Sequence, residues 1–371
     1  MSRSLRIAYF AHSLRSDWNN GNAHFLRGLM RGLGQMGHDV TVYEPCSEWS
    51  IQHLREEPRG EESLRCFSET YPDIRIQTYR AAEGANTGHW ASALRDRDMV
   101  ILHEWNPPAL AHALLQVRGE AGFRLLFHDT HHRASSSPEQ IRLMRLADFD
   151  GVLCFGESLR DIYRNRFDIQ QAWVLHEAAD TTVFRPQPSG VKTADVVWIG
   201  NWGDGERSRE IREFLLDPAA GMPNRNFVIY GVRYPDDGLA ALERAGVRYG
   251  GYLPNLDAPD AYASARLTVH IPRQHYTAAM TGIPTIRVFE ALACGVPLIS
   301  APWRDTETLF REGDFVMVRN GTEMKSAMKR LLEDKSAADQ QALRGLETIL
   351  SRHTCRHRAE ELTSICEELV L

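Results

Sequence analysis

Residues 281–299 most restrict what this chain can fold into, and they read Thr-Gly-Ile-Pro-Thr-Ile-Arg-Val-Phe-Glu-Ala-Leu-Ala-Cys-Gly-Val-Pro-Leu-Ile. Pro284 lies in a predicted loop, and Thr285 is a good N-cap for the helix formers that follow it. Gly295 fits the position just after the last helical residue. The apolar run from Val296 is typical of a buried parallel strand. The stretch therefore predicts a loop, a short helix, a tight turn and a strand of an α/β protein.

The start of this predicted helix is suited to binding a phosphate. A helix N-terminus presents backbone N–H groups and a partial positive charge, and here these groups belong to Thr285, Ile286 and Arg287. Pro284 has no N–H, so it shapes the loop without donating. Glu290 lies about one turn further along, and its carboxylate would repel a phosphate. We expect Glu290 to bind neutral hydroxyls instead, such as those of a ribose.

The segment from Phe289 to Pro297, Phe-Glu-Ala-Leu-Ala-Cys-Gly-Val-Pro, resembles the signature of GT-B glycosyltransferases. The resemblance is to the retaining group 1 family, and in particular to its CgeB-like branch. It implies that Glu290 holds the ribose of a sugar nucleotide and that the helix start receives the diphosphate. That family has a second Glu on the transferred sugar, at the position where this chain has Gly282. The alternative is an ordinary helix–strand unit of any α/β domain.

Size and composition exclude several classes of protein. The 371 residues suggest about two domains, and a hydrophobic content of 43% is ordinary for a globular chain. The net charge of −6 gives no overall basic field for nucleic acid or an anionic membrane. No apolar run is long enough to span a membrane, and no signal-peptide pattern opens the chain. The cysteines are scattered without C-x-x-C pairs, which predicts neither a zinc site nor a disulfide framework. We expect a cytoplasmic protein with at most peripheral membrane contact.

The N-terminal part reads as a βαβ unit. Residues 6–11 predict a buried strand, 25–33 an amphipathic helix and 40–43 a second strand. The loop before the helix ends in Gly21 and Asn22, at the sheet edge where such folds bind ligands. It has no G-x-G-x-x-G, so a dinucleotide is not favoured. The resemblance places Gly21 and Asn22 near the bound donor or acceptor, whereas a plain tight turn is the alternative.

Two further predicted strands lead into polar side chains. The strand over 99–103 ends at His103 and Glu104, and the strand over 123–127 runs into the segment 128–132. Because the ends of parallel strands meet at one edge of the sheet, these side chains predict a site there. We place His103, Glu104 and His131 on the acceptor side. Residues 46–70, in contrast, are charged and are predicted to be irregular and solvated.

The segment His128-Asp-Thr-His-His132 has three interpretations. Its residue types can bind a metal, although no complementary cluster stands elsewhere in the sequence. They can also be ordinary hydrogen-bonding residues at a strand end. The third interpretation is that the segment resembles the His-Asp-x-His pattern of GT-B enzymes such as trehalose-phosphate synthases. That resemblance implies that His128 binds a sugar hydroxyl and that Asp129 stabilises the cationic sugar that develops.

The second domain opens after a linker in the Pro-containing segment 185–190. A strand over 195–199 runs into the loop 200–209, whose residues Gly200 and Asn201 let a diphosphate approach the backbone. The arginines of this loop can add charge-assisted hydrogen bonds, with Arg207 the first choice and Arg209 the second; the family resemblance implies a basic residue here.

The same loop carries two opposing charges, Asp204 and Glu206, so a solvated helix start is the alternative. Further along, the segment Gly-Tyr-Leu-Pro254 resembles the turn that frames the base in this family. Tyr252 and Leu253 are therefore candidate base contacts, with core packing as the alternative.

The resemblance covers nearly the whole chain and implies an α/β protein of the GT-B class. That class has two Rossmann-like domains whose parallel sheets face an interdomain cleft, with a C-terminal helix that crosses back to the first domain. We assign residues 1–184 to an acceptor-side domain, 185–350 to a nucleotide-sugar-binding domain and 351–371 to the returning helix.

The expected function is that of a hexosyltransferase-type glycosyltransferase (EC 2.4). It would move a sugar from a UDP- or GDP-linked donor to a small-molecule, glycan or glycolipid hydroxyl, with retention and without a metal or other cofactor. His128, Asp129 and Arg207 are the predicted catalytic residues. Four alternatives remain: a nucleotide-sugar epimerase or hydrolase, a metal-dependent hydrolase built on 128–132, a non-catalytic nucleotide-sugar sensor and a DNA-modifying glycosyltransferase, which the acidic charge disfavours. The sugar, the base, the acceptor and the oligomeric state are not predicted.

Overall fold

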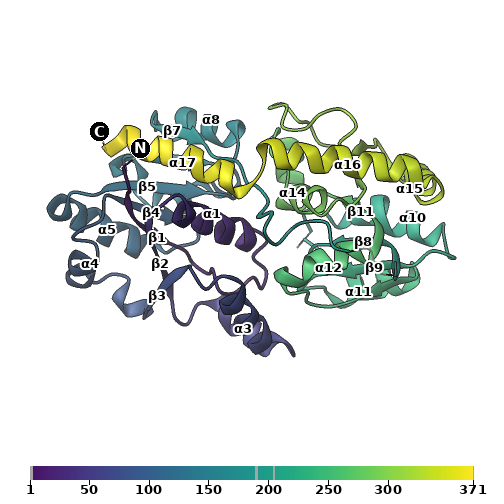
Figure 1. The fold of residues 1–371 in the computed structure, drawn as a ribbon, viewed down its shortest axis with the longest axis horizontal. Helices are drawn as coiled ribbons and strands as arrows, with labels where there is room; N and C mark the ends of the chain where they lie inside the picture. The colour runs from purple at the N-terminus through teal and green to yellow at the C-terminus, as the bar shows by residue number, and fades with distance from the viewer. Residues whose placement is uncertain (1–2, 189–190, 204, 371) are drawn as a thin grey trace. The chain divides into compact units, whose positions relative to one another are not determined.

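The computed structural model describes residues 3–188, 191–203 and 205–370, so Asp204 and the end of the predicted linker lie outside the described residues (Figure 1). The chain divides into two compact units. Unit 1 comprises residues 1–177 together with 355–371, and unit 2 comprises 178–354.

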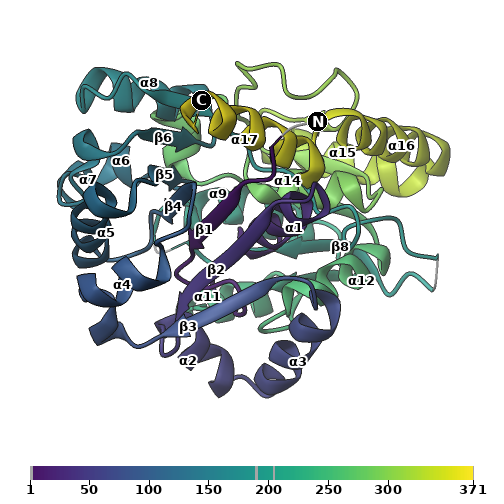
Figure 2. The ribbon, with the colours of Figure 1, turned by 60° about the vertical axis from the view of Figure 1, so that its left-hand side comes forward.

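Unit 1 is built on one parallel sheet of seven strands in the order β3-β2-β1-β4-β5-β6-β7 (Figure 2). Helices cover a parallel sheet on both faces, so its central strands are largely apolar and buried, and all five residues of β4 are buried. The strands are β1 Arg6–Phe10, β2 Asp39–Pro45, β3 Arg75–Tyr79, β4 Met99–His103, β5 Arg124–Asp129, β6 Gly151–Cys154 and β7 Ala172–Val174.

The C-terminal helix α17 belongs to unit 1, where it packs along α1 (Figure 1). The two backbones approach closely at Gly32, because a Cβ there would lie 3.0 Å from the Cβ of Ala359. The helices of unit 1 are α1 Ala23–Gln35, α2 Trp49–Glu56, α3 Gly60–Thr70, α4 Thr87–Ala93, α5 Pro108–Ala121, α6 Arg133–Ser136, α7 Pro138–Arg142, α8 Glu157–Arg166 and α17 Cys355–Val370.

The prediction that residues 46–70 are irregular is wrong, because the helices α2 and α3 occupy most of this segment. Each helix buries only a narrow apolar stripe, with Ile51 and Leu54 in α2 and Phe67 in α3. The remaining positions carry charges that pair on the helix surface, such as Arg59 with Glu62 at 2.9 Å. Each stripe has the spacing of a helix, but the many charges around it made that spacing hard to recognise in the sequence.

Unit 2 has a second parallel sheet of six strands in the order β10-β9-β8-β11-β12-β13. Together the two sheets confirm the predicted pair of parallel-sheet α/β domains. The strands are β8 Ala194–Ile199, β9 Phe227–Tyr230, β10 Val247–Tyr249, β11 Ala265–His270, β12 Leu298–Ser300 and β13 Val316–Met317.

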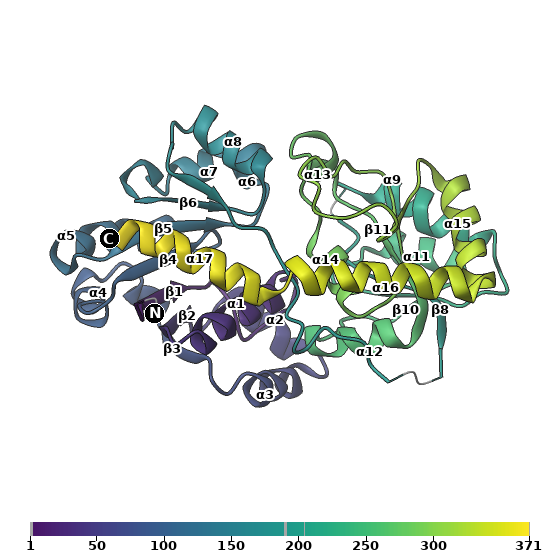
Figure 3. The same cartoon turned by 45° about the horizontal axis from the view of Figure 1, so that its top comes forward.

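Helix α14 of unit 2 lies beside α16 (Figure 3). The predicted helix over 208–216 is a short α-helix, α9, that continues as the π-helical turn Arg212–Leu216. The helices of unit 2 are α9 Ser208–Ile211, α10 Asp217–Ala220, α11 Asp236–Arg244, α12 Ala258–Ala263, α13 Gln274–Ala278, α14 Ile286–Ala293, α15 Gly321–Glu333 and α16 Lys335–Arg352.

The segment that opened the sequence analysis folds as predicted. Thr285 is the N-cap of α14 in extended conformation, although its side chain makes no capping bond. Gly295 has a φ of +64°, as the left-handed position after a helix requires. The N–H groups of Gly295 and Val296 donate to the carbonyls of Leu292 and Ala291, which is the Schellman pattern. β12 then follows as a fully buried strand.

Across the part of the chain that the structure describes, the helices are all too short or too polar to cross a lipid bilayer.

We expect Gly32→Val to lower the free energy of unfolding by about 1–3 kcal/mol, because the new side chain overpacks the contact between α1 and α17. Gly34→Val is the matched control, since the same helix leaves Gly34 exposed with no atom near its Cβ position. It should stay within about 0.5 kcal/mol of the wild type. Urea unfolding of both variants gives the measurement. Equal effects at the two positions would contradict the docking of α17 on α1.

Candidate functional site

The order of strands in unit 2 marks where a ligand is expected. From β8 the chain adds β9 and β10 on one side and then β11, β12 and β13 on the other. The sheet therefore has its topological switch point between β8 and β11. Open α/β sheets bind ligands outside the carboxyl ends of the strands at this point.

Arg207 lies at this switch point and joins the loops that follow β8 and β11. Its Nε and Nη2 donate to the carbonyl of Asn201 at 3.1 and 2.6 Å, and its Nη1 donates to the carbonyl of Ile271 at 3.4 Å. Its guanidinium also lies 5.1 Å from the centre of the Trp198 ring. Gly203 leaves room for the side chain, because a Cβ there would lie 2.7 Å from the Cγ of Arg207. The loop is thus built around this arginine.

No carboxylate pairs with Arg207 among the residues that the structure describes. The residue is 9% exposed, and burial lowers the pKa of its guanidinium to about 10, helped by the charges of Arg273 and Arg287. The group is still charged at neutral pH. A buried charge is normally compensated by an opposite one. Arg207, which alone of these three arginines has no carboxylate partner among the described residues, is therefore a candidate anion-binding group.

The two arginines near Arg207 come from the start of α14 and from the loop after β11. Arg287 is in the first turn of α14, where the N–H groups of Thr285, Ile286 and Arg287 precede the helix's own hydrogen bonds. Arg273 follows β11 and pairs with Glu206 at 3.0 Å. Glu206, predicted to oppose a phosphate, is therefore neutralised by Arg273 rather than facing an anion alone.

Glu290 lies on α14, fully buried, and holds three polar side chains. Its Oε1 accepts from the amide of Asn255 at 3.3 Å, and its Oε2 accepts from Tyr262 at 3.3 Å and from Arg287 at 2.5 Å. Asn255 follows the half-buried Tyr252 and Leu253 closely in the chain. The structure thus brings the predicted ribose and base positions together.

Gly282 shows why this chain departs from the pattern with two glutamates. Its φ is +96°, and a Cβ would lie 2.3 Å from Oγ1 of Thr306 and 3.1 Å from Oε1 of Glu307. A side chain at this position would be strained and would clash with a neighbouring loop. Contact with the transferred sugar through a glutamate here is therefore not available to this fold.

The other predicted donor residues divide into two groups. Gly200 and Asn201 are held in the loop, because the carbonyl of Gly200 accepts from Tyr234 and Oδ1 of Asn201 accepts from the N–H of Val232. Arg209 points outward, with 82% of its side chain exposed and an ion pair to Glu210. The structure therefore separates the two arginines of the loop that the sequence could only rank.

His270, the last residue of β11, lies at the same carboxyl edge of the unit 2 sheet, and the sequence analysis did not single it out. Its Nδ1 lies 2.8 Å from Oγ of Ser300, which itself donates to the carbonyl of Ala301. Because Ser300 has one proton to give, His270 must donate from Nδ1, so its Nε2 is an acceptor. Burial, with the charge of Arg207, lowers the pKa of His270 to about 3. This Nε2 has no partner among the described residues and suits a hydroxyl group.

Unit 1 has its own switch point, between β1 and β4, and most of the predicted acceptor-side residues meet near it. Thr130 is the centre of the network. Its hydroxyl oxygen lies 2.9 Å from the amide nitrogen of Asn22, 3.2 Å from Nε2 of His103 and 3.3 Å from Oε1 of Glu104. Gly21 precedes Asn22 at the start of α1. Thr130 was not singled out in the sequence, because a lone threonine has no signature.

His128 and Asp129 lie on opposite faces of β5, as consecutive strand residues must. His128 bonds the hydroxyl of Tyr9 at 2.8 Å, and Asp129 accepts from Tyr163 at 2.5 Å and from the N–H of His131 at 2.9 Å. Both side chains are fully buried inside unit 1. Their predicted contact with the transferred sugar stays a prediction. Because they point apart, the pair does not form the core of a shared metal site.

Burial also sets the protonation of the acidic groups in this network. It raises the pKa of Glu104 to about 8 and that of Asp129 to about 7, while it lowers the pKa of His103 to about 3. Glu104 and His103 lie 2.8 Å apart. Near pH 7 the network is therefore close to neutral and is rich in groups that hydrogen-bond hydroxyls.

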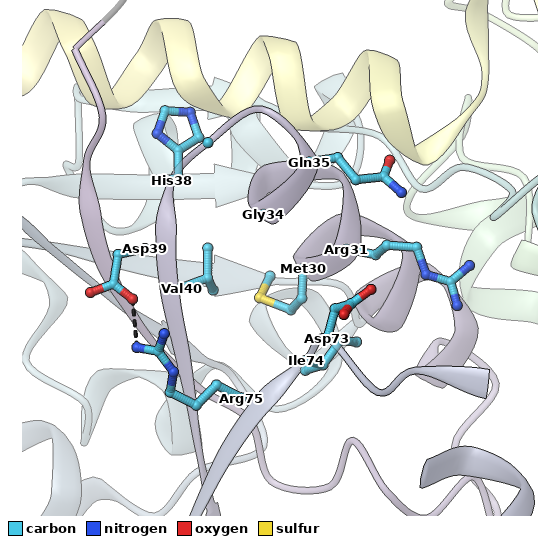
Figure 4. Close-up of a pocket in the computed structure, with 11 residues that line it drawn as sticks. Met30, Arg31, Gly34, Gln35, His38, Asp39, Val40, Asp73, Ile74 and Arg75 are labelled. Atoms are coloured by element: carbon cyan, nitrogen blue, oxygen red, sulfur yellow. Dashed lines mark hydrogen bonds and ion pairs between the residues drawn. The ribbon is translucent and has the colours of Figure 1, made fainter. Parts of the chain in front are cut away.

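A pocket of about 510 Å³ opens at the other edge of the unit 1 sheet (Figure 4). It lies between the end of α1, the turn before β2 and the start of β3, and an Asp39–Arg75 ion pair of 2.6 Å stands at its rim. None of the predicted site residues lines it. It is remote from the carboxyl ends of the strands, so we do not assign the candidate site to it.

Comparison with known proteins fits this geometry. Residues 207–364, from Arg207 into α17, match the family described as "Glycosyl transferase-like". HepE of Anabaena, solved with UDP and glucose, superposes with a TM-score of 0.71 at 14% identity, over 97% of this chain and 98% of its own. The chain has the GT-B fold of glycosyltransferases. No curated protein sequence matches it.

Other GT-B structures are similar over the same span. Sucrose-phosphate synthase of Thermosynechococcus elongatus gives a TM-score of 0.64 at 14% identity, covering 99% of each chain. An α-glucosyltransferase in complex with UDP and a DNA containing an HMU base gives 0.70 at 12% identity, over 98% of this chain and 100% of its own. At these identities the likeness shows the fold, and the residues of the site have to carry the function.

We expect Glu104→Gln to weaken the pH dependence of stability between pH 6.5 and 9. In this range the unfolded state has lost the Glu104 proton, because the ordinary pKa is 4.5, whereas the folded state keeps it up to about pH 8. The wild type should therefore lose about 2 kcal/mol of unfolding free energy as the pH rises through 8. Glutamine keeps the shape without the titration.

Urea unfolding at a series of pH values gives this measurement. Glu139→Gln is the control, because the Glu139 carboxylate is 82% exposed and pairs only with Arg142 among the described residues. It should leave the pH profile unchanged. A Glu104→Gln profile parallel to that of the wild type would show that Glu104 is ionised in the folded protein.

Proposed function

We propose that this GT-B protein transfers a sugar from a nucleoside-diphosphate sugar to an acceptor hydroxyl. The observation that carries the proposal is Arg207, a buried guanidinium without a carboxylate partner at the switch point of unit 2. The start of α14 and the guanidinium of Arg287 lie near it, and Glu290 follows one turn later. A diphosphate next to a ribose supplies the anion and the hydroxyls that these groups require.

The donor we favour is a uridine diphosphate sugar. HepE was solved with UDP-glucose, and the α-glucosyltransferase was solved with UDP. Within unit 2, the diphosphate would meet Arg207 and the first turn of α14, and the ribose would meet Glu290. The base would lie at Tyr252 and Leu253. The acceptor nitrogen of His270 would then take a hydrogen bond from a hydroxyl of the transferred sugar.

The chemistry follows from where charge develops. The bond between the anomeric carbon and the diphosphate oxygen breaks, and negative charge builds up on the leaving diphosphate. Arg207, Arg273 and Arg287 with the α14 N-terminus stabilise that charge in the transition state. The acceptor hydroxyl forms the new bond to the anomeric carbon and passes its proton to the leaving phosphate. The uncompensated charge of Arg207, together with the α14 N-terminus, supplies the positive charge that a metal ion supplies elsewhere, which supports catalysis without a metal.

Retention of configuration is the part of this proposal that rests on the family resemblance of residues 289–297. Transfer from UDP-α-glucose should give an α-linked product, and no second carboxylate is needed when the leaving phosphate takes the proton. The coupling constant of the anomeric proton at the new glycosidic bond, read from the ¹H NMR spectrum of the product, decides the matter. A β-linked product would contradict the retaining mechanism but not the proposed donor site.

The decisive experiment is thermal unfolding with UDP, comparing Arg207→Ala with Arg209→Ala. UDP at 100 times its Kd should stabilise the wild type by about 2.7 kcal/mol. Arg207→Ala removes charge-assisted hydrogen bonds of about 1.5–3 kcal/mol, so UDP should bind roughly 10–150-fold more weakly. Arg209→Ala is the matched control from the same loop, and its exposed side chain predicts an unchanged UDP shift.

Two further arms separate the alternatives. Glu290→Gln, which keeps the shape of the side chain, should weaken UDP and uridine but not inorganic pyrophosphate, because Glu290 is assigned to the ribose. Turnover of UDP-glucose without any acceptor would indicate a hydrolase or epimerase, and binding without turnover would indicate a sensor. If no nucleotide shifts the wild type, or if the two arginine variants respond alike, the diphosphate site is wrong.

A further inference from the structure

The edge of unit 1 next to the Thr130 network carries two exposed tryptophans. Trp49 at the start of α2 is 38% exposed, and Trp105 after β4 is 39% exposed. Soluble proteins seldom leave large aromatic rings open to water without a use for them. These two rings do not lie alone, because His12, just after β1, has ring contacts with both of them, at 6.3 and 6.1 Å between centroids.

Both indole rings are held in place by other side chains. The guanidinium of Arg133 lies over the Trp105 ring at 4.1 Å, and His131 meets the same ring edge-on. Trp18 packs edge-on against Trp49. Trp18 is fixed in turn by a hydrogen bond from its Nε1 to Glu57 at 2.9 Å. The rings are therefore preorganised, so a ligand would pay little conformational entropy to bind them.

Beside the two rings lies a polar group that is buried and without a partner. His12 is 4% exposed, and its Nδ1 makes no hydrogen bond to any described residue. Its ring stacks on that of His103, whose Nδ1 is also buried without a partner. An unsatisfied buried polar atom costs free energy, which a ligand that hydrogen-bonds it would recover.

The ring of His12 carries no charge of its own at neutral pH. Burial first, and then the charges of His103 and Arg133, lower the pKa of His12 well below its ordinary value, so the ring is neutral at pH 7. Arg133 lies over the Trp105 ring and donates to the carbonyl of Glu104, which satisfies an N–H group without cancelling the positive charge. The surface thus offers two flat aromatic rings, and neutral hydrogen-bonding atoms lie buried directly beside them.

We propose that Trp49, Trp105 and His12 form the acceptor subsite and that the acceptor is a saccharide. This inference rests on the proposed function. A pyranose ring has an apolar face of axial C–H bonds and a rim of hydroxyls. The C–H face packs on the electron-rich face of an indole, and a hydroxyl pairs with Nδ1 of His12. A purely apolar acceptor would use only the indole rings.

The site also explains what the buried network beneath it does. Asn22, Thr130, His103 and Glu104 are linked by hydrogen bonds and lie under His12 through its stack on His103. They hold the histidine pair in one orientation, so the network positions the subsite. Asn106 adds to this by donating to the carbonyl of Phe10, which ties the loop after β4 to the end of β1.

Saturation-transfer-difference NMR on the full chain tests the proposal without any donor or turnover. The probes are methyl α-glucopyranoside, methyl α-galactopyranoside and methyl α-mannopyranoside, with p-nitrophenol and thymidine as flat aromatic probes. At least one glycoside should receive saturation mainly on the protons of one ring face. Trp49→Ala and Trp105→Ala should each reduce its affinity at least tenfold, and phenylalanine at either position should restore part of it.

The controls keep folding and the proposed donor site apart from this result. Leu143→Ala removes an exposed apolar side chain of unit 1 that is 60% exposed, and it should change nothing. Each variant is also titrated with UDP by thermal unfolding. UDP binding that survives together with lost glycoside binding supports the subsite. If the wild type itself does not bind UDP, the proposed function on which the subsite rests is wrong.

Two results would overturn the proposal. If no glycoside binds, or if glycosides bind equally well to the wild type and to both alanine variants, the aromatic pair is not a saccharide site. If thymidine or p-nitrophenol binds at Trp49 and Trp105 and the glycosides do not, the site takes a planar aromatic acceptor.

Discussion

A buried guanidinium that no described carboxylate neutralises is the constraint on which the site of unit 2 depends. Arg207 is held by two backbone carbonyls, one after β8 and one after β11, so it fixes both sides of the switch point at once. Carbonyl oxygens satisfy its N–H groups but do not cancel its charge. The glycine at 203, the start of α14 and the positions of Arg273 and Arg287 all make sense around this one uncompensated charge. In the proposed function this charge is in place before the donor binds, which is the condition for stabilising a leaving group.

Unit 1 has the same type of sheet, but the groups at its switch point are mostly neutral instead of charged. Its switch point gathers histidines and carboxylic acids, and burial drives both kinds of group toward their neutral forms. Neutral donors and acceptors recognise hydroxyls without attracting ions. In the proposed function the two sheets would divide the requirements of glycosyl transfer, with charge on unit 2 and hydroxyl recognition on unit 1. This division supports the function more directly than the low sequence identity to other GT-B proteins.

The sequence predicted best where the determinants are local. The N-cap at Thr285, the left-handed Gly295 and the buried strand after it all depend on neighbouring residues, and each stands where the pattern placed it. The prediction for residues 46–70 was wrong because the helices of this segment show only a few apolar positions among many charges. The sequence ranked Arg207 before Arg209 as the phosphate contact, but both are arginines in one Gly-rich loop and no local pattern showed which of them is buried. Only the fold buries one of them and leaves the other in solvent.

What the sequence determined by itself was the alternation of strands and helices, the stop and start signals and the family signature around Glu290. These depend on side-chain period, capping and glycine, which act within a few residues. The tertiary structure alone decided which partners surround each functional group. Asn255 and Tyr262 reach Glu290 from elsewhere in the chain, Thr306 closes the space at Gly282, and Ser300 sets the proton of His270. Such pairs are distant along the chain and meet through the packing of parallel strands, so no local pattern encodes them.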